Sequence, residues 1–540
     1  MKYIRHIVEI CKKLAPLYAL MLSGNMFAVV CEMSDSSYLN LAKFVGADAF
    51  HSRGIYGQGV SVANLEISVV SEDDDPAYFT FLKDSNYTTY HPDGTYENGG
   101  DNHPYVTLSI MAGYNASYEN QEVSTGIAWQ ANYVSGQVAT TSPFVYDNYA
   151  IQTYENFFSN GTDVISSSWV NESFSTYMVG TILDSYAAKN THTLLVGAAS
   201  NNGSEGAGHV ASPYKNMNCV KVGALDYATG FKTAADFSSY GPNDFYNPVT
   251  GETIVGVVSA VDIAAPGTVY SVNRDGSLGN ISGTSFAAPI VASTATLMIS
   301  YSRENSMPQE SRDARLLKAI LLNSASKIDG WDNGAYKGSV DVNGKRYDGV
   351  LTTTQALDYH SGAGALNAGE ALAQYDNFGA TSFLDSVGKG ESHFYDFYAS
   401  EAGLEFAATL CWYLGSDVED ITYEDLFLDG KEVAAIDADL SYFANLNLRL
   451  WYVEGGEEVL LAQSISEYNN VEHLFLELDR EGEYRLEVFF EDLVYGDSAA
   501  ESYGVAWNLS QVPEPSSCAA IFGVAILAFA AYRKKRIVQK

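Results

Sequence analysis

Cysteine is scarce in this chain, with five residues among 540. Three of them, Cys11, Cys31 and Cys518, lie in or beside the terminal segments, and no Cys-x-x-Cys or Cys/His spacing typical of a metal site occurs. The sequence therefore predicts no disulfide framework and no cysteine-based metal centre. Stability must come from buried apolar cores, and the 46% hydrophobic content is ample for two or three domains.

Basic residues are also few. The chain has 30 Lys and Arg against 66 Asp and Glu, which gives a formal net charge of −36. An excess of this size disfavours nucleic acid and anionic membrane surfaces as partners, because both repel negative charge. We therefore expect no nucleic-acid partner, and the charge suits a protein that stays soluble outside the cytoplasm.

Long apolar runs are confined to the two ends. At the start, a basic stretch with Lys2, Arg5, Lys12 and Lys13 leads into a mostly apolar run at 14–30. This order is typical of a secretory signal, so residues 1–31 are predicted to direct export. A buried N-terminal helix is the alternative.

The C-terminal run has a more specific context. Val-Pro-Glu-Pro at 512–515 precedes an apolar run at 518–532, which a basic cluster at 533–536 follows. The run is short for a span, since about 17 residues is the lower limit, and the basic cluster suits retention at the cytoplasmic face.

This ending resembles the PEP-CTERM sorting signal of Gram-negative bacteria that make exopolysaccharide. The resemblance implies that residues 511–540 are a sorting and anchor segment, recognised by an exosortase-type machinery and at least transiently in the membrane. The expected location is then the cell envelope or the extracellular space. A plain tail anchor is the alternative.

One internal segment carries the chemistry. Gly-Thr-Ser-Phe-Ala-Ala-Pro-Ile-Val-Ala at 283–292 predicts a tight turn that leads into a helix of small apolar residues. Ser285 would lie at the helix N-terminus, where unpaired N–H groups and the helix dipole favour developing negative charge. A Thr-capped helix without catalytic meaning is the ordinary alternative.

Further polar residues precede this turn in a definite order. Glu66 ends a predicted buried strand, and His103 opens a predicted helix. Ser168 and Trp169 lie in the polar end of a second predicted strand, at 163–170, and Asn201 follows a third, before Gly203. For each residue taken alone, an ordinary loop or core position is the competing interpretation.

Taken together, these segments resemble the subtilisin-like serine proteases over about residues 40–375. The resemblance implies that Ser285 is the nucleophile, His103 its base and Asn201 an oxyanion donor. Glu66 stands where the family has its orienting aspartate. Ser168 and Trp169 align with the strand edge that pairs with the substrate backbone, so they are predicted to bind substrate.

The predicted fold class is α/β. Strands that alternate with helices over 40–375 predict a mainly parallel sheet, and the resemblance implies the three-layer subtilisin-like arrangement. Helices are expected at 37–53 and 176–190.

Beyond residue 375 the pattern becomes alternating, so 376–510 is predicted to be a β-sandwich similar to pre-peptidase C-terminal modules. Strands at 474–478 and 484–488 are expected to form a hairpin.

The predicted function is an exported serine endopeptidase acting on peptides or proteins through a Glu/His/Ser triad. A weak or inactive subtilisin-fold binding or structural protein remains the alternative, because the extra methylene of Glu66 moves its carboxylate by about 1 Å. No cofactor is predicted. Acidic clusters such as Asp437 to Asp439 could bind calcium, but a solvated face is the favoured interpretation.

Overall fold

The computed structural model describes residues 41–70, 86–92, 102–113, 116–118, 121–123, 126–141, 144–145, 147–170, 176–211, 215–273, 278–419, 435–437 and 439–511. The predicted export signal at 1–31 and all but the first residue of the predicted sorting segment lie outside these residues. Within them, no helix is both long and apolar enough to cross a membrane.

A seven-stranded sheet with every pair parallel forms the centre of the first part of the chain, in the order β13-β10-β9-β8-β1-β5-β2. Four of its strands are buried at every residue, as a parallel sheet covered on both faces requires. The predicted α/β class is confirmed. The strands are β1 (Ser61–Glu66), β2 (Asn86–Tyr90), β5 (Asn132–Gln137), β8 (Val164–Ser167), β9 (Leu194–Ala198), β10 (Val220–Leu225) and β13 (Ile263–Pro266).

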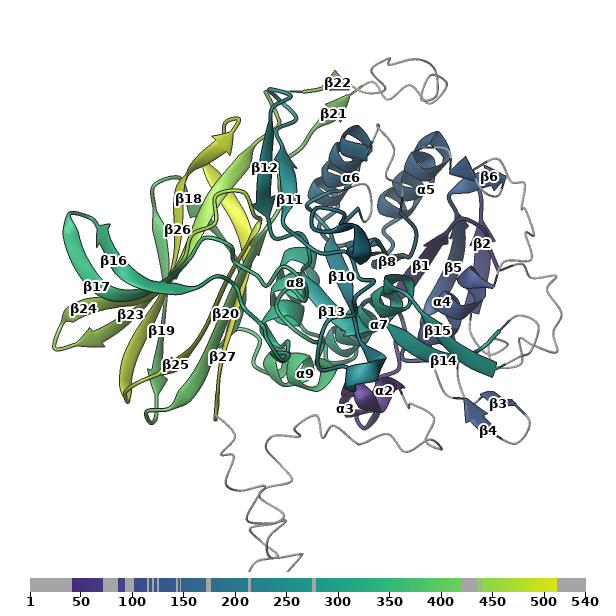
Figure 1. Ribbon diagram of the computed structural model, residues 1–540, viewed down its shortest axis with the longest axis horizontal. Helices are drawn as coiled ribbons and strands as arrows, with labels where there is room; N and C mark the ends of the chain where they lie inside the picture. Colours follow the sequence, from purple (N-terminus) through teal and green to yellow (C-terminus); the bar gives the residue numbers. More distant parts are fainter. Residues whose placement is uncertain are drawn as a thin grey trace, which may run out of the picture.

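Helices cover both faces of this sheet (Figure 1). Successive side chains of a strand point to opposite faces, and β1 shows the result. Asn64 donates to Thr107 of α4 at 3.2 Å, whereas Leu65 and Phe157 of α5 both lie against Gly136 on the other face. The helix predicted at 176–190 is confirmed as α6. The helices are α4 (His103–Ala112), α5 (Asp147–Ser159), α6 (Thr176–Lys189), α7 (Thr284–Glu304), α8 (Ala314–Asn323) and α9 (Ala368–Asp376).

The continuous helix predicted at 37–53 is wrong. The described part of this segment forms two short helices, α2 (Leu41–Phe44) and α3 (Asp48–His51). Gly46 between them has φ +79°, which a right-handed helix cannot include. A Cβ at this position would lie 2.8 Å from the Gly369 nitrogen, so glycine also permits close packing on α9.

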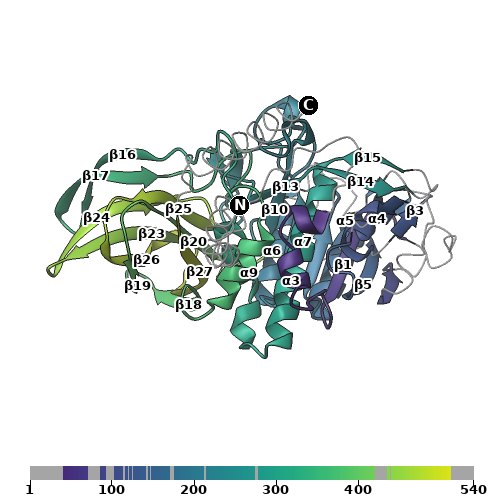
Figure 2. The same cartoon turned by 90° about the horizontal axis from the view of Figure 1, so that it is seen from below.

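The second part of the chain contains two antiparallel-rich sheets, ordered β16-β17-β24-β23-β26-β19 and β18-β27-β20-β25. Two strands of the larger sheet, β16 and β17, precede the boundary expected near residue 375 (Figure 2). The division at that point stays a prediction. The strands are β16 (Tyr336–Val342), β17 (Lys345–Thr353), β18 (Ser382–Gly388), β19 (Ser392–Ala399), β20 (Leu404–Trp412), β23 (Phe443–Glu454), β24 (Glu457–Ser464), β25 (Val471–Leu478), β26 (Gly482–Tyr495) and β27 (Ala500–Gln511).

The predicted hairpin of β25 and β26 is also wrong. β25 pairs with β20 in one sheet, whereas β26 pairs with β19 and β23 in the other. Leu474 and Leu486 are both buried in the core between the sheets, at 2% and 0% exposure. Alternation therefore identified the inward faces correctly, but it carries no information on which strand becomes the partner.

The two parts share a buried interface. α8 packs on β20 and β27, and a Cβ on Gly504 would lie 2.5 Å from the Leu316 Cα, so β27 meets the helix backbone directly. Thr409 donates to Asn323 at 3.1 Å across this interface.

The remaining strands form antiparallel pairs at the periphery: β3 (Ala116–Tyr118) with β4 (Gln121–Val123), β6 (Ala139–Thr141) with β7 (Phe144–Val145), β11 (Asn243–Tyr246) with β12 (Thr253–Val258), β14 (Thr268–Val272) with β15 (Leu278–Ser282), and β21 (Val418–Glu419) with β22 (Ala435–Ile436).

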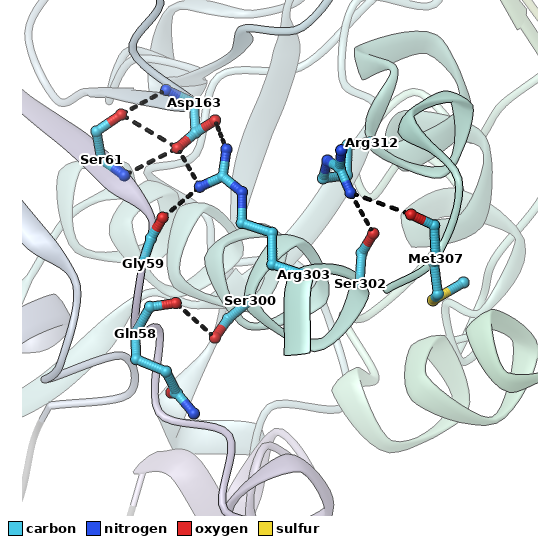
Figure 3. A network of polar contacts seen from close by, with 9 residues as sticks. All are labelled: Gln58, Gly59, Ser61, Asp163, Ser300, Ser302, Arg303, Met307 and Arg312. Carbon is cyan, nitrogen blue, oxygen red and sulfur yellow. Dashed lines mark hydrogen bonds and ion pairs between the residues drawn. The ribbon is translucent and has the colours of Figure 1, made fainter. Parts of the chain in front are cut away.

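A polar network attaches the C-terminal end of α7 to the sheet (Figure 3). Asp163 is 8% exposed and accepts hydrogen bonds from the Ser61 amide at 2.9 Å and from two nitrogens of Arg303 at 2.7 and 2.8 Å. Arg303 also donates to the Gly59 carbonyl. Bidentate contacts between a guanidinium and a carboxylate restrict orientation as well as distance. This end of α7 is therefore held against the starts of β1 and β8.

Candidate active site

An acid and a histidine meet at the carboxyl edge of the parallel sheet. Glu66 is the last residue of β1 and is 1% exposed, and His103 is the first residue of α4. His103 Nδ1 lies 2.9 Å from Glu66 Oε2, which is hydrogen-bond distance. The longer acid therefore reaches the imidazole.

His91 is the histidine nearest to His103 in the sequence. It follows the edge strand β2, is 4% exposed, and stacks on Tyr149 with ring centroids 5.5 Å apart. The histidine that the structure places at hydrogen-bond distance from Glu66 is His103. Pro104 does not disturb the helix, because its ring occupies the first turn, where no intrahelical N–H bond is lost.

Ser285 lies in the first turn of α7, as expected, and is partly exposed. The next residue, Phe286, places its ring 5.3 Å from the His103 imidazole, centroid to centroid. The start of α7 therefore adjoins the histidine. Backbone N–H groups of a first helical turn lack the usual acceptor four residues earlier, so those without another acceptor can bind an anion.

Asn201 is oriented by the same turn. Its Oδ1 accepts hydrogen bonds from the Thr284 amide at 2.9 Å and from the Thr284 hydroxyl at 3.1 Å. The amide nitrogen is left as the outward donor, and a Cβ on Gly283 would lie 3.6 Å from it. Ser200, just before it, is 4% exposed and has φ +86°, a strained conformation of the kind found at functional sites.

Comparison with known proteins identifies the family of this chain. The profile of the subtilase family (Peptidase S8) matches residues 57–379, more than half of the chain. The chain belongs to the subtilase family. All four predicted catalytic residues lie inside the matched range.

Individual relatives are distant. Subtilisin DY of Bacillus licheniformis is 26% identical over 258 residues, which are 47% of this chain and 82% of that protein. Subtilisin NAT of Bacillus subtilis subsp. natto is 28% identical over 260 residues, 47% of this chain and 59% of that protein. The chain thus spans less than two thirds of subtilisin NAT. The prenylagaramide maturation protease PagA is a similar solved structure, with 20% identity, a TM-score of 0.41, and coverage of 61% of this chain and 98% of that one.

The two predicted substrate-binding residues of this subtilase differ in their surroundings. Ser168 is 3% exposed and donates to the Ser285 carbonyl at 2.8 Å, so it holds the residue expected to react. Trp169 is 4% exposed, and its ring lies 6.3 Å from that of the buried Tyr154. The Trp169 side chain thus belongs to the core, and only the backbone remains for the predicted pairing with substrate.

A hairpin beside the site was not predicted from the sequence. Asn273, after β14, accepts a hydrogen bond from Asn102 at 2.7 Å, immediately before His103. Ser271 and Ser109 place their hydroxyls 3.3 Å apart, which links the same hairpin to α4. These contacts steady the helix that carries the histidine. The sequence could not have predicted these contacts, because single Asn and Ser residues have no local pattern that indicates their partners.

The part of this subtilase that the structure describes contains no group of three or more His, Cys, Asp or Glu arranged to hold a metal ion. Asp437 and Asp439 belong to a local turn, in which the Asp439 amide donates to the Asp437 carboxylate at 3.0 Å. The expectation that calcium does not bind there stays a prediction.

The orientation of Asn201 leads to a selective test. Aspartate at this position keeps the acceptor for Thr284 but replaces the donor with a charged oxygen. We expect Asn201→Asp to lower kcat by about 10²–10³-fold, which is the loss that follows removal of an oxyanion donor in subtilisin itself. KM and the melting temperature should change little. Steady-state kinetics with the exposed Asn160→Ala as control would check this, and a kcat within threefold of wild type would contradict it.

Proposed function

We propose that this subtilase is an exported serine endopeptidase that hydrolyses peptide bonds through Glu66, His103 and Ser285. The observation that carries the proposal is the 2.9 Å contact between Glu66 and His103. It joins a buried carboxylate to an imidazole beside the first turn of α7. A site that had lost its acid would leave this imidazole without an orienting partner.

The mechanism follows from the chemistry of these groups. Ser285 Oγ attacks the carbonyl carbon of the scissile bond while His103 accepts the hydroxyl proton. The negative oxygen that forms is bound by the Asn201 amide and by the Ser285 N–H. His103 then gives its proton to the departing amine, and water repeats the sequence to release the acid. Glu66 holds the imidazole and stabilises its positive charge throughout.

Substrates of this site would be extended peptides. Ser168 and Trp169 directly follow β8, and their backbone would pair with an incoming strand as sheet edges do in β-augmentation. Such pairing reads backbone and not side chains, so the proposed substrate class is peptide or unfolded protein in general.

The direct test is proteolysis by the full chain. Purified protein is incubated with an unfolded protein substrate, and new amino termini are mapped by mass spectrometry. New termini that appear with the wild-type protein and not with Ser285→Ala support the proposal. A folded protein that binds peptides without cleaving them would establish the alternative, a binding or structural protein on the subtilase scaffold.

Export and sorting form a second part of the proposal. The basic and apolar segments at both ends support export with both ends held at the cytoplasmic face, followed by cleavage near Pro-Glu-Pro at 513–515 by an exosortase-type machinery. The full chain carries a formal net charge of −36, and loss of its two basic ends would make the released protein more acidic still. In the envelope or the extracellular polymer, this charge would limit adhesion to anionic polysaccharide.

Intact-mass measurement of the exported protein from a native-like host tests this processing. We expect a mature form that lacks the residues after the Pro-Glu-Pro segment, with activity in the released fraction. A permanent tail anchor predicts the reverse, with the basic cluster at 533–536 retained and the activity in the membrane fraction. Full-length tails on all exported molecules would refute the processing step.

A further inference from the structure

Both oxygens of the Glu66 carboxylate have partners, and both partners come from α4. Oε2 meets His103 at 2.9 Å, and Oε1 accepts a hydrogen bond from the Thr107 hydroxyl at 2.7 Å. His103 and Thr107 are four residues apart, so they lie on the same helix face. One face of α4 therefore supplies both the histidine and the threonine hydroxyl that binds the second carboxylate oxygen of Glu66.

Thr107 is itself supported from the strand that carries the acid. Asn64, two residues before Glu66 and on the same face of β1, donates to the Thr107 hydroxyl at 3.2 Å. Asn64 and Thr107 are both fully buried, and within the described residues Asn64 Oδ1 has no hydrogen-bond partner. An amide at this position leaves one polar atom unsatisfied, and its donated hydrogen bonds, to Thr107 and more weakly to the Pro104 carbonyl at 3.5 Å, offset this cost.

The Thr107 hydroxyl has other acceptors within reach. The carbonyls of Pro104 and His103 lie at 3.1 and 3.3 Å, the local pattern of a helical threonine. The carboxylate is the closest of the three and carries a charge, which makes it the strongest acceptor. With its single proton directed to Glu66, the hydroxyl still accepts from Asn64.

A glutamate needs this second hydrogen bond more than an aspartate does, because its side chain has one more rotatable bond. Contact with His103 alone would leave rotation about the carboxyl group unrestrained, and small displacements of catalytic groups are costly. We propose that Thr107, supported by Asn64, is the positioning residue that allows a glutamate to orient the catalytic histidine. This inference rests on the proposed function.

The test compares Thr107→Val with Thr107→Ser in the full-length protein. Valine keeps the branched shape and loses the hydroxyl, whereas serine keeps the hydroxyl. We expect Thr107→Val to lower kcat about tenfold with KM within twofold, and Thr107→Ser to restore most of the loss. The matched control is Thr296→Val, which should leave kcat unchanged. Thr296 is a buried helical threonine whose hydroxyl, among the described residues, bonds the Ala292 carbonyl at 2.9 Å.

A double-mutant cycle separates positioning from a purely structural role. In the Glu66→Asp background, the shorter carboxylate cannot reach both partners, so adding Thr107→Val should change kcat less than twofold. An equal tenfold loss in both backgrounds would show that Thr107 only stabilises α4, and would overturn the inference. Loss of kcat in Thr107→Ser as large as in Thr107→Val would overturn it as well.

A spectroscopic measurement keeps this inference distinct from the proposed function. At low pH the proton between His103 Nδ1 and Glu66 should give a far-downfield NMR resonance whether or not the protein cleaves peptides. We expect this resonance to weaken or shift in Thr107→Val and to persist in Thr107→Ser. An unchanged resonance in Thr107→Val would refute the positioning role. Absent proteolysis with a Thr107-dependent resonance would refute only the proposed function.

Discussion

Ser285→Ala is expected to abolish covalent labelling by a fluorophosphonate probe and to reduce peptide hydrolysis to near background. His103→Ala should do the same, because without the imidazole the serine hydroxyl keeps its proton and is a weak nucleophile. In subtilisin itself, loss of either group costs about 10⁶-fold in kcat, and we expect a loss of comparable order here.

The control for this experiment is Ser282→Ala, three residues before the nucleophile. Ser282 is exposed, and its hydroxyl pairs with that of Thr268 at 2.9 Å. Its removal should leave labelling intact. Equal labelling of wild type, Ser285→Ala and His103→Ala would show that the probe reacts elsewhere and that Ser285 is not the nucleophile.

Substitutions at Glu66 should both reduce kcat, for different reasons. Glu66→Gln keeps the size of the side chain but offers the imidazole no negative charge, and a loss of about 10⁴-fold is expected from the equivalent change in another serine protease. Glu66→Asp keeps the charge but withdraws the carboxylate by about 1 Å, a displacement that can cost about a hundredfold. Rapid-mixing kinetics with a chromogenic peptide would measure both, with the exposed Glu457→Gln as control.

Two outcomes would contradict this account of the acid. A strong rise in activity for Glu66→Asp would mean that the native site is a degraded version of the aspartate-containing one. Unchanged activity in both variants of an active enzyme would mean that another group orients His103. The 2.9 Å contact between Glu66 and His103 and the second hydrogen bond, from Thr107 to Glu66, argue for a site adapted to glutamate.

Local sequence patterns were sufficient for much of the protein. The run of small residues after Ser285 predicted the start of a buried helix, and α7 begins at Thr284. Regular alternation of strands and helices predicted the parallel sheet, because crossover helices are the standard connection between parallel strands. Asn201 was predicted as an oxyanion donor from the resemblance to subtilisin-like proteases, and the preceding strand and the following Gly203 supported that prediction.

Only the tertiary structure decided how distant residues meet. Whether Glu66 reaches His103, and that Thr107 holds its second oxygen, depends on the placement of α4 over β1 to within an ångström. The partners of β25 and the burial of the Trp169 side chain were likewise beyond the sequence. Periodicity records which face of an element is buried, but hydrogen-bond partners are chosen by packing between segments far apart in the chain, and no local pattern encodes that choice.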